Sequence, residues 1–324
     1  MLNTADKPLK VLIIGLGGIS FRYDEDLPAT FVLTHARAFT IHSKFTLVGG
    51  VDLNKKNRDD FSLAYNCNVY GEIEDAVKNE LPDVIVVATP TETHCQVIKT
   101  IFNHSKPPFI LCEKPLAYNI SEAQEILKAC KDNNAWLYVN YMRNSSKVTS
   151  HISECINNGV ILPPFKIVHW YTKGLYNSAS HFIALFNHLL GMPLNVKLLD
   201  DLIDRTAIDP EPNFKITYRH AEAIFIALNK DNFFHNSFEL IAKNGRLLYE
   251  QGGETVKWFR IESSGGFSNY KRISPNPVNF DSDFNLMQFT LVDNFWNEIN
   301  SNNGVLCSGE DAYNTLLTIN KILN

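Results

Sequence analysis

The sequence lacks the features that mark several common protein classes. None of the apolar runs in its 324 residues is long enough to cross a bilayer, and the amino terminus has no apolar signal segment. The six cysteines are scattered without a C-x-x-C pair, and the ten histidines show no metal-ligand spacing. We therefore expect a cytoplasmic protein with reduced cysteines and no bound metal.

An excess of positive charge is also missing. The net charge is -5 and the isoelectric point is about 6.1, with no sustained basic stripe, which argues against a nucleic-acid partner. The short basic run at residues 55–58 is interpreted as the solvated start of a helix. The composition, with 45% hydrophobic and 20% charged residues, is that of a soluble globular enzyme, and the length suits two domains.

Strand-like and helical patterns alternate over residues 1–140. Strands are predicted at residues 9–14, 45–51, 69–70, 83–88, 109–112 and 136–140. Helices are predicted at residues 31–42, 55–65, 72–79, 91–102 and 121–131. This alternation predicts a doubly wound α/β domain, in which right-handed crossovers connect the strands of a parallel sheet.

The pattern changes in residues 141–324, which we expect to form a second domain. Helices are predicted at residues 146–157, 180–190, 286–300 and 310–322, and the last of these is a candidate to pack back on the first domain. Strands are predicted at residues 165–171, 215–218, 223–228, 238–242 and 246–249, with a hairpin turn at Asn244-Gly245. Residues 252–285, rich in Gly, Ser, Asn and Pro, are predicted as loops. Together these segments indicate an α+β domain with a largely antiparallel open sheet.

A glycine-rich turn follows the first strand and predicts a dinucleotide site. Gly15-Leu16-Gly17-Gly18-Ile19-Ser20 is a G-x-G-x-x-S sequence, whose backbone would approach a pyrophosphate closely. Asp52 ends the second strand and would hydrogen-bond the ribose hydroxyls of NAD. The separation between the glycine turn and Asp52 is longer than usual, because residues 21–34 look like an insertion. The alternative is that Asp52 is simply a carboxylate at the start of a helix. NAD is the favoured cofactor, although the lysines and arginine of residues 55–58 would also be compatible with NADP.

Two further strand ends carry candidate residues. The strand at residues 83–88 turns sharply at Thr89-Pro90, where the nicotinamide half of a dinucleotide would lie, and Thr91 or Thr93 is a candidate helix cap. Glu113-Lys114-Pro115 follows the strand at residues 109–112. In an open parallel sheet, ligands bind at the carboxyl ends of the strands. The proline would restrict the direction of Lys114, although a plain surface turn is the alternative.

In this order the motifs resemble the Gfo/Idh/MocA oxidoreductases, and the resemblance extends over essentially the whole chain. The matching segments are Gly15 to Gly18, Val51-Asp52, Ala88-Thr89-Pro90 with His94, Glu113-Lys114-Pro115, Asn140 to Arg143, Gly174 to His181 and Ser308 to Ala312. The family implies that residues 1–140 form a Rossmann dinucleotide-binding domain. It implies that residues 141–324 form a substrate-binding and oligomerisation domain, whose open sheet often joins subunits. It implies cofactor contacts by Ile19, Thr89, Pro90, His94, Glu113, Lys114 and Asn140 in addition to the glycines and Asp52.

The resemblance also implies which residues carry the chemistry. Lys114 would lie beside the nicotinamide and the reacting hydroxyl, on a Lys-Pro peptide that is often cis in the family. The family's Asp-x-x-x-His motif reads Asn177 to His181 here, so the histidine is present and the aspartate is not. A second family aspartate, four residues after the histidine, is replaced by Ala184-Leu185. A branch of the family linked to polysaccharides has asparagine in this region, so we do not interpret the change as inactivation.

These residue types suit the oxidation or reduction of an alcohol. His181 suits a general acid and base because its ordinary pKa lies near neutrality, and Lys114 would orient the hydroxyl and stabilise the developing alkoxide. Asn177 as a simple helix cap, and His181 as an ordinary helix histidine, are the alternatives. Further candidates for the substrate pocket are Tyr141, Arg143, Lys173, Tyr176 and Asn177. Arg143 or Lys173 would suit a carboxylate or phosphate on the substrate.

Two functions from different classes follow from this sequence. The first is an NAD(P)-dependent oxidoreductase acting on a secondary alcohol of a sugar, cyclitol or nucleotide sugar, assembled as a homodimer or homotetramer through the second sheet. The second is a non-catalytic, dinucleotide-binding regulator with the same fold. The presence of both Lys114 and His181 favours the enzyme, and the altered Asn177 and Ala184 keep the regulator open.

Overall fold

The computed structural model describes residues 7–199, 207–229, 231–264 and 270–324. Contacts divide the chain into two compact units. The first unit consists of Met1–Ser145 and Asn285–Leu316, and the second consists of Ser146–Phe284 and Leu317–Asn324. The boundary expected from the sequence was a single one, after residue 140.

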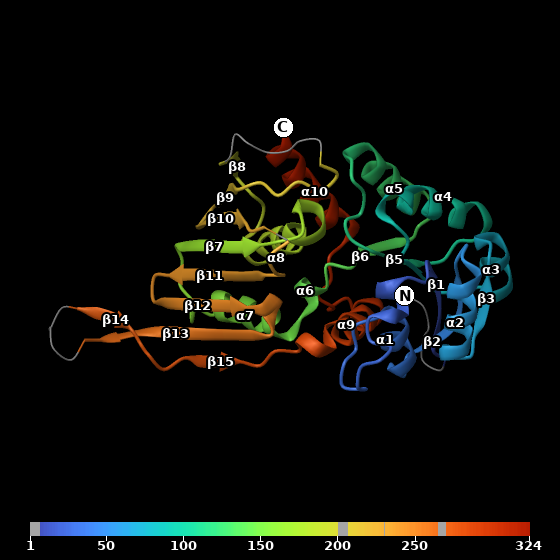
Figure 1. Ribbon diagram of the computed structural model, residues 1–324, viewed down its shortest axis with the longest axis horizontal. Coiled ribbons are helices and arrows are strands. Elements are labelled where there is room, and N and C mark those ends of the chain that lie inside the picture. The colour runs from blue at the N-terminus through green and yellow to red at the C-terminus, as the bar shows by residue number, and fades with distance from the viewer. Residues whose placement is uncertain (1–6, 200–206, 230, 265–269) are drawn as a thin grey trace. The chain divides into compact units, whose positions relative to one another are not determined.

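The first unit contains a six-stranded sheet in the order β3-β2-β1-β4-β5-β6 (Figure 1). All neighbouring strands are parallel, which confirms the doubly wound domain. The central strands β1, β4 and β5 are almost wholly buried, as expected where helices cover both faces of a parallel sheet. The strands are β1 (Leu9–Ile14), β2 (Phe45–Val51), β3 (Asn68–Tyr70), β4 (Val84–Val87), β5 (Phe109–Cys112) and β6 (Trp136–Val139).

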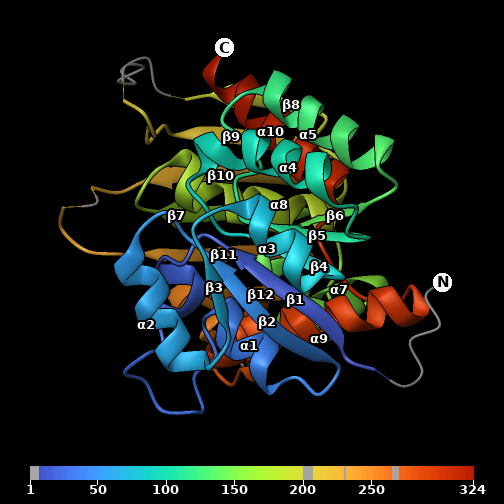
Figure 2. The same cartoon turned by 90° about the vertical axis from the view of Figure 1, so that its right-hand side faces the viewer.

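Helices cover both faces of this sheet. Phe39, Phe61 and Phe295 from α1, α2 and α9 belong to one apolar cluster on one face, and α3, α4 and α5 pack in a row on the other (Figure 2). Within the described ranges, no helix is long and apolar enough to span a membrane. The helices of this unit are η1 (Gly18–Arg22), α1 (His35–Ile41), α2 (Lys55–Tyr65), α3 (Ile73–Glu80), η2 (Thr91–Thr93), α4 (His94–His104), α5 (Ile120–Asp132), α6 (Met142–Ser145) and α9 (Met287–Ser301).

The first crossover helix starts later than the sequence pattern predicts. A helix was expected over residues 31–42, but α1 begins at His35. Asp24, fully buried, accepts hydrogen bonds from the backbone of Leu33 and Thr34 at 2.8 and 3.0 Å. Thr34 then caps the helix by accepting from the backbone N–H of Arg37. The insertion at residues 21–34 is therefore held by a buried carboxylate that competes with a longer helix.

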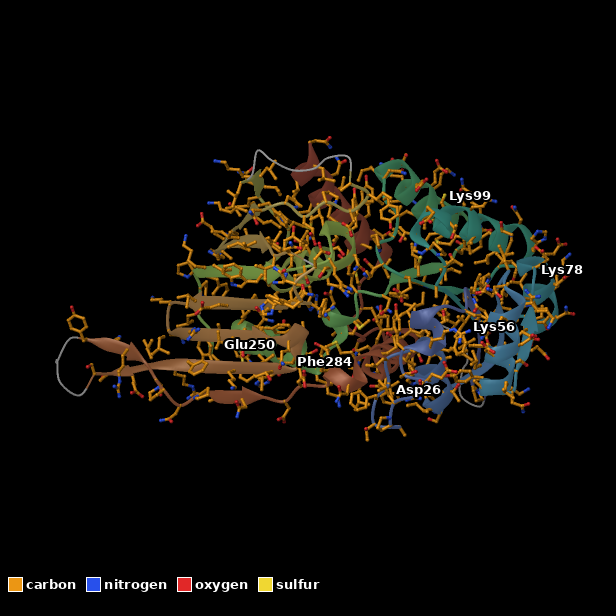
Figure 3. All side chains as sticks on the ribbon, viewed as in Figure 1. Asp26, Lys56, Lys78, Lys99, Glu250 and Phe284 are labelled. Carbon is orange, nitrogen blue, oxygen red and sulfur yellow. The ribbon has the colours of Figure 1, made fainter. Side chains whose placement is uncertain are left out.

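The basic run at the start of α2 is solvated, as predicted. Lys55 and Lys56 are 77% and 76% exposed and pair with Asp59 and Asp60, one helical turn further on. Figure 3 shows Lys56 among the lysines at the outer surface of this unit. Exposed pairs of this kind contribute only about 0.3–0.5 kcal/mol each.

The second unit contains a nine-stranded sheet in the order β14-β13-β12-β11-β7-β10-β9-β8, with β15 paired to β13 (Figure 1). Among the described strands, β7 and β10 pair in parallel and the other pairs are antiparallel, which confirms the predicted sheet type. The strands are β7 (Phe165–Tyr171), β8 (Asn195–Leu198), β9 (Phe214–Tyr218), β10 (Ala221–Ala227), β11 (Asn236–Ala242), β12 (Gly245–Glu250), β13 (Thr255–Ser263), β14 (Lys271–Ile273) and β15 (Val278–Phe280).

One face of this sheet is covered and the other carries alternating exposed side chains. Ile152, Phe182 and Ile319 from α7, α8 and α10 join the apolar cluster on the covered face. On the opposite face, Trp170 and Ile241 are 39% and 42% exposed. The helices of this unit are α7 (Lys147–Asn157), η3 (Leu175–Ala179), α8 (Ser180–Leu190) and η4 (Gln251–Gly253), while η5 (Phe284–Leu286) and α10 (Gly309–Leu323) lie across a unit boundary in the sequence.

The prediction of loops throughout residues 252–285 is wrong. This segment contains three strands, and β13 is the longest of them. Val256 and Trp258 are buried at alternate positions of β13, 2% and 1% exposed, and their strand pairs with β12. Pairing with an existing sheet therefore outweighs the weak strand propensity of the Gly, Ser and Asn residues nearby.

The predicted hairpin is present, but its turn lies one residue earlier. Ala242 pairs with Gly245, so Lys243 and Asn244 form the turn. Gly245 is needed for a different reason, because a Cβ there would lie 2.4 Å from the carbonyl oxygen of Phe259. Its lack of a side chain lets β13 approach closely.

Candidate active site

The predicted cofactor residues of the first unit lie along one edge of its sheet. Strands β1, β2, β4 and β5 are parallel neighbours, so their carboxyl ends meet at the same edge. These ends carry the glycine turn, Asp52, Thr89-Pro90 and Glu113-Lys114 respectively. Asn140 follows the end of the neighbouring strand β6. The topology thus brings together segments that are far apart in the sequence.

Gly15 and Gly17 differ in what a side chain at each position would meet. Gly15 has a φ of 90° and donates its N–H to Val51 at 2.8 Å. A Cβ on Gly15 would lie 2.6 Å from the carbonyl oxygen of Ala88, so the backbone of β4 fills that space. A Cβ on Gly17 would have no atom within 4 Å. Gly15 is therefore required by packing, whereas Gly17 leaves open space at the turn.

An aromatic side chain from the insertion lies against the third glycine. A Cβ on Gly18 would be 2.3 Å from the ring of Tyr23, although 64% of Tyr23 is exposed. The residues on either side of Tyr23 are anchored. Arg22 hydrogen-bonds to side chains of α2, and Asp24 is buried. This contact was not foreseen from the sequence, because the insertion has no regular pattern.

Asp52 connects the end of β2 to the glycine turn. One carboxylate oxygen accepts from the backbone N–H of Leu16 at 2.8 Å and from Asn57 at 3.2 Å. The other oxygen accepts from the N–H of Asn54 at 2.7 Å. Asn54 itself caps α2, because its side chain accepts from the N–H of Lys56. Asn54 is therefore the N-cap of α2, and Asp52 also acts as a carboxylate at the start of this helix, through the backbone of Asn54 and the side chain of Asn57.

A cavity of about 370 Å³ lies beside these groups, and its volume is in the range of small-molecule sites. Its lining combines the polar side chains of Asp52, Glu72, Thr89 and Thr93 with apolar ones. The open space at Gly17, the carboxylate of Asp52 and this cavity together fit a dinucleotide. The lining residues are Ile14, Gly15, Val51, Asp52, Leu53, Gly71, Glu72, Ile73, Thr89, Pro90, Thr93 and Val97.

The turn after β4 is held by side chains rather than by a helix cap. The hydroxyl of Thr93 lies 2.8 Å from the Thr89 hydroxyl and 2.7 Å from the carbonyl oxygen of Pro90, and neither η2 nor α4 has a side-chain cap. His94 is fully buried between the carbonyl oxygens of Leu116 and Thr89, at 3.1 and 3.0 Å. Burial lowers the pKa of His94, which favours a neutral ring that donates to one of these two carbonyl oxygens.

Glu113 and Lys114 occupy the end of β5 in different environments. Glu113 is 8% exposed, and its carboxylate accepts from Asn140 at 2.6 Å and contacts His35 at 2.7 Å. Lys114 is half-buried, and the Lys114-Pro115 peptide is cis, as the family resemblance implied. The turn therefore presents a lysine at the edge of the sheet above a buried carboxylate.

The second unit holds the remaining predicted site residues at the start of α8. Lys173 and Asn177 are exposed, Tyr176 is half-buried and His181 is 8% exposed. Lys173 lies over the ring of Phe234, with its Nζ 5.0 Å from the ring centre. Asn177 lies inside the π-helical turn η3 and caps neither η3 nor α8. The interpretation of Asn177 as a helix cap is thus wrong.

Two carboxylates from a distant loop hold this turn instead. Asp209 accepts from the backbone N–H groups of Tyr176 and Asn177 at 2.7 and 3.0 Å, and Glu211 accepts from that of Gly174 at 3.0 Å. Anionic groups are favourable where such N–H groups lack partners at the start of a helix. The sequence analysis missed both residues, because they are more than 30 positions away and belong to no recognisable motif.

The predicted residues therefore fall into two sets. Lys114, Tyr141 and Arg143 belong to the first unit, whereas Lys173, Tyr176, Asn177 and His181 belong to the second. Tyr141 is buried and Arg143, in α6, is half-buried. In the parts of the chain that the structure describes, no three His, Cys, Asp or Glu side chains form a group able to hold a metal ion.

Comparison with known proteins relates the chain to one enzyme family. Residues 9–141 match the family model GFO_IDH_MocA, described as "Oxidoreductase family, NAD-binding Rossmann fold". Among curated proteins, an inositol 2-dehydrogenase of Rubrobacter xylanophilus is 23% identical over 164 residues, which cover 50% of this chain and 44% of that protein. The chain spans less than half the length of the curated relatives it matches first.

Solved structures share the fold over nearly the whole chain. A putative NADPH-dependent oxidoreductase of Desulfitobacterium hafniense has a TM-score of 0.79 at 16% identity, covering 98% of this chain and 95% of that one. The WlbA dehydrogenase of Bordetella pertussis, in complex with NADH and UDP-GlcNAcA, has a TM-score of 0.74 at 16% identity, with the same coverage. At this identity, the similarity to solved structures establishes the fold.

Proposed function

Because residues 9–141 match the model of the Gfo/Idh/MocA oxidoreductases, described as an NAD-binding Rossmann fold, we propose that the whole chain is an NAD(P)-dependent oxidoreductase of this family. It would act on a secondary alcohol of a sugar, cyclitol or nucleotide sugar. The observation that carries the proposal is the shared edge of the first sheet. There the open glycine turn, the carboxylate of Asp52 and Lys114 follow strands that lie in one parallel sheet.

The residues at this edge have distinct roles toward the cofactor. The open space at Gly17 would accommodate a pyrophosphate, and the carboxylate of Asp52 would accept hydrogen bonds from the ribose hydroxyls. The Thr89-Pro90 turn, held by Thr93 and His94, also lines the cavity. NAD, when bound, supplies a nicotinamide ring that exchanges a hydride with the substrate carbon.

Lys114 and His181 divide the proton chemistry between them. Lys114 donates a hydrogen bond to the reacting hydroxyl and stabilises negative charge as its proton leaves. His181 takes that proton during oxidation and returns it during reduction, since an imidazole has an ordinary pKa near neutrality. Asn177 orients the hydroxyl or the imidazole through its amide. The family resemblance, which implies these roles for Lys114 and His181, supports the assignments.

The substrate is expected to carry an anionic group. Arg143 and Lys173 are the cations among the predicted pocket residues, and guanidinium and ammonium groups bind carboxylates and phosphates well. The molecules named for two similar proteins differ in charge. One is an inositol 2-dehydrogenase, and the WlbA structure contains the acidic nucleotide sugar UDP-GlcNAcA. We propose a nucleotide sugar, with Tyr141 and Tyr176 contacting its rings.

Turnover with a substrate panel tests the proposal. Purified protein is incubated with NAD or NADP and with sugars, cyclitols and UDP-sugars, and nicotinamide absorbance is followed. We expect turnover with at least one acidic nucleotide sugar. Binding of NADH without turnover across a broad panel would instead favour the non-catalytic regulator.

Asp52 is expected to determine the choice between NAD and NADP. In Asp52→Ser, the affinity for NADH should fall at least about tenfold, because two charge-assisted hydrogen bonds to ribose are lost. The affinity for NADPH should rise relative to NADH, since the carboxylate no longer repels the 2′-phosphate. Nicotinamide fluorescence gives both dissociation constants without a substrate. Asp59→Ser, which changes an exposed carboxylate of α2, is the matched control, and equal ratios in the two variants would contradict the role of Asp52.

We also propose that the exposed face of the second sheet joins copies of the chain into a homodimer or homotetramer. Trp170 on β7 and Ile241 on β11 are exposed on neighbouring strands. Light scattering should give two or four times the chain mass of 36.8 kDa, and Trp170→Arg should lower the mass. A single-chain mass for the unaltered protein would refute this assembly.

A further inference from the structure

Four buried polar side chains meet beneath the turn that carries Lys114. His35 comes from α1, Glu113 from the end of β5, Asn140 from the end of β6 and Gln288 from the start of α9. Three of them are 0% exposed and Glu113 is 8% exposed. Buried polar groups are costly unless they are hydrogen-bonded, so the pattern of their contacts is informative.

The contacts determine where the protons lie. The Oε1 atom of Gln288 is 3.2 Å from the amide nitrogen of Asn140 and accepts from it, so the Nε2 atom of Gln288 faces His35 Nδ1 at 2.9 Å and donates to it. With Nδ1 as an acceptor, the proton of His35 is on Nε2, which donates to Glu113 at 2.7 Å. Asn140 donates to the same carboxylate oxygen at 2.6 Å. The amides thus orient the imidazole toward Glu113.

The network keeps Glu113 ionised in spite of its burial. Burial by itself would raise the pKa of Glu113, but His35, Asn140 and the charge of Lys114 together hold this pKa below its usual value. Burial biases the neighbouring groups His94 and Cys112 toward their uncharged forms. It lowers the pKa of His94 and raises that of the Cys112 thiol. Glu113 is therefore the anion that faces Lys114 from within the sheet.

The carboxylate is also connected directly to the lysine's backbone. The second oxygen of Glu113 accepts from the N–H of Lys114 at 3.3 Å. We propose that His35 and Gln288 are positioning residues for Lys114: they hold Glu113 as a carboxylate, which fixes the turn and favours the charged form of the lysine. The importance of this for turnover rests on the proposed function, whereas the effect on the lysine's charge does not.

Chemical labelling of Lys114 tests the network without NAD or substrate. Acetic anhydride reacts with the uncharged amine, so a nearby anion slows labelling, and peptide mass spectrometry measures the rate at each lysine. In His35→Leu, Glu113 loses its imidazole donor and becomes protonated, so labelling of Lys114 should rise about tenfold relative to Lys99. Glu113→Gln should give the same rise, and combining the two changes should add nothing further.

Two variants separate positioning from simple packing. His35→Gln retains a donor that can reach Glu113 and should return labelling toward the unaltered rate. Thr290→Val changes another buried polar residue of α9 outside the network and should leave labelling unchanged. If His35→Leu does not fold cooperatively, Gln288→Met takes its place, because it removes the donor to Nδ1 while conserving side-chain volume.

The results can also overturn the inference. Unchanged labelling of Lys114 in a folded His35→Leu or Gln288→Met protein would refute control of the lysine by the network. So would a further increase when His35→Leu is added to Glu113→Gln. Failure of the proposed function is a separate result, because it is measured as turnover in Lys114→Met, whereas labelling requires no reaction.

Discussion

Replacement of Lys114 by methionine is expected to lower kcat by about 10²–10³-fold, the usual cost of removing a group that stabilises charge in the transition state. Methionine keeps the unbranched apolar stem of the half-buried lysine, so packing at the end of β5 is largely conserved. The charge and the hydrogen-bond donors are lost. Steady-state turnover by nicotinamide absorbance, with the substrate found in the panel, gives kcat and KM.

Two measurements show whether the fall in kcat comes from the reaction step and not from weaker cofactor binding or a general effect of removing a lysine. The dissociation constant of NADH, from nicotinamide fluorescence, should change less than about threefold, because the glycine turn and Asp52 remain. Lys99→Met, which removes a solvent-exposed lysine of α4, should retain full turnover. A kcat within twofold of the unaltered protein in Lys114→Met would remove Lys114 from the mechanism.

Substitution of the turn glycines is expected to separate stability from cofactor binding. In Gly15→Ala, the new methyl group would meet the backbone of Ala88 at 2.6 Å, and the φ of 90° is unfavourable for any residue with a side chain. Strain of this kind costs about 1–3 kcal/mol before the clash is counted. We expect a fall in melting temperature of about 5 °C or more, measured by calorimetry, together with weaker NADH binding.

Gly17→Ala is the matched control, since its methyl group would have no neighbour within 4 Å. Its melting temperature should therefore stay within about 1 °C of the unaltered value, because surface changes without contacts have little effect. NADH binding should still weaken by about tenfold or more, as the methyl group occupies the space expected for the pyrophosphate. Equal loss of stability in the two variants, or unchanged NADH affinity in Gly17→Ala, would contradict these different roles.

Helix and strand bounds were predicted accurately where local interactions determine them, and less accurately where distant residues contribute. The strand at residues 165–171 and the helix at residues 180–190 were predicted with the bounds that the structure has. The helix predicted to start at residue 31 begins at His35, because the buried Asp24 binds the preceding backbone. The loops predicted over residues 252–285 include β13, which depends on pairing with β12. Local patterns failed where a distant group supplied the hydrogen bonds.

The sequence by itself determined the order of the motifs and most of the elements that carry them. The apolar runs, the glycine turn and Glu113-Lys114-Pro115 are local signals, and alternating strands and helices lead to a parallel sheet. That was sufficient to predict the cofactor residues at the strand ends. The action of Lys114 and His181 on the same hydroxyl stays a prediction, and Lys114→Met tests the role of the lysine in it.

Only the tertiary structure decided what supports these residues. His35 and Gln288, which contact each other, are separated by 253 positions. Asp209 accepts a hydrogen bond from the backbone N–H of Asn177, which is 32 positions away. No periodicity links such residues, because each contact forms only after separate elements have packed. A buried carboxylate must find donors wherever the folded chain brings them, so the surroundings of Glu113 were set by packing and not by the motif that contains it.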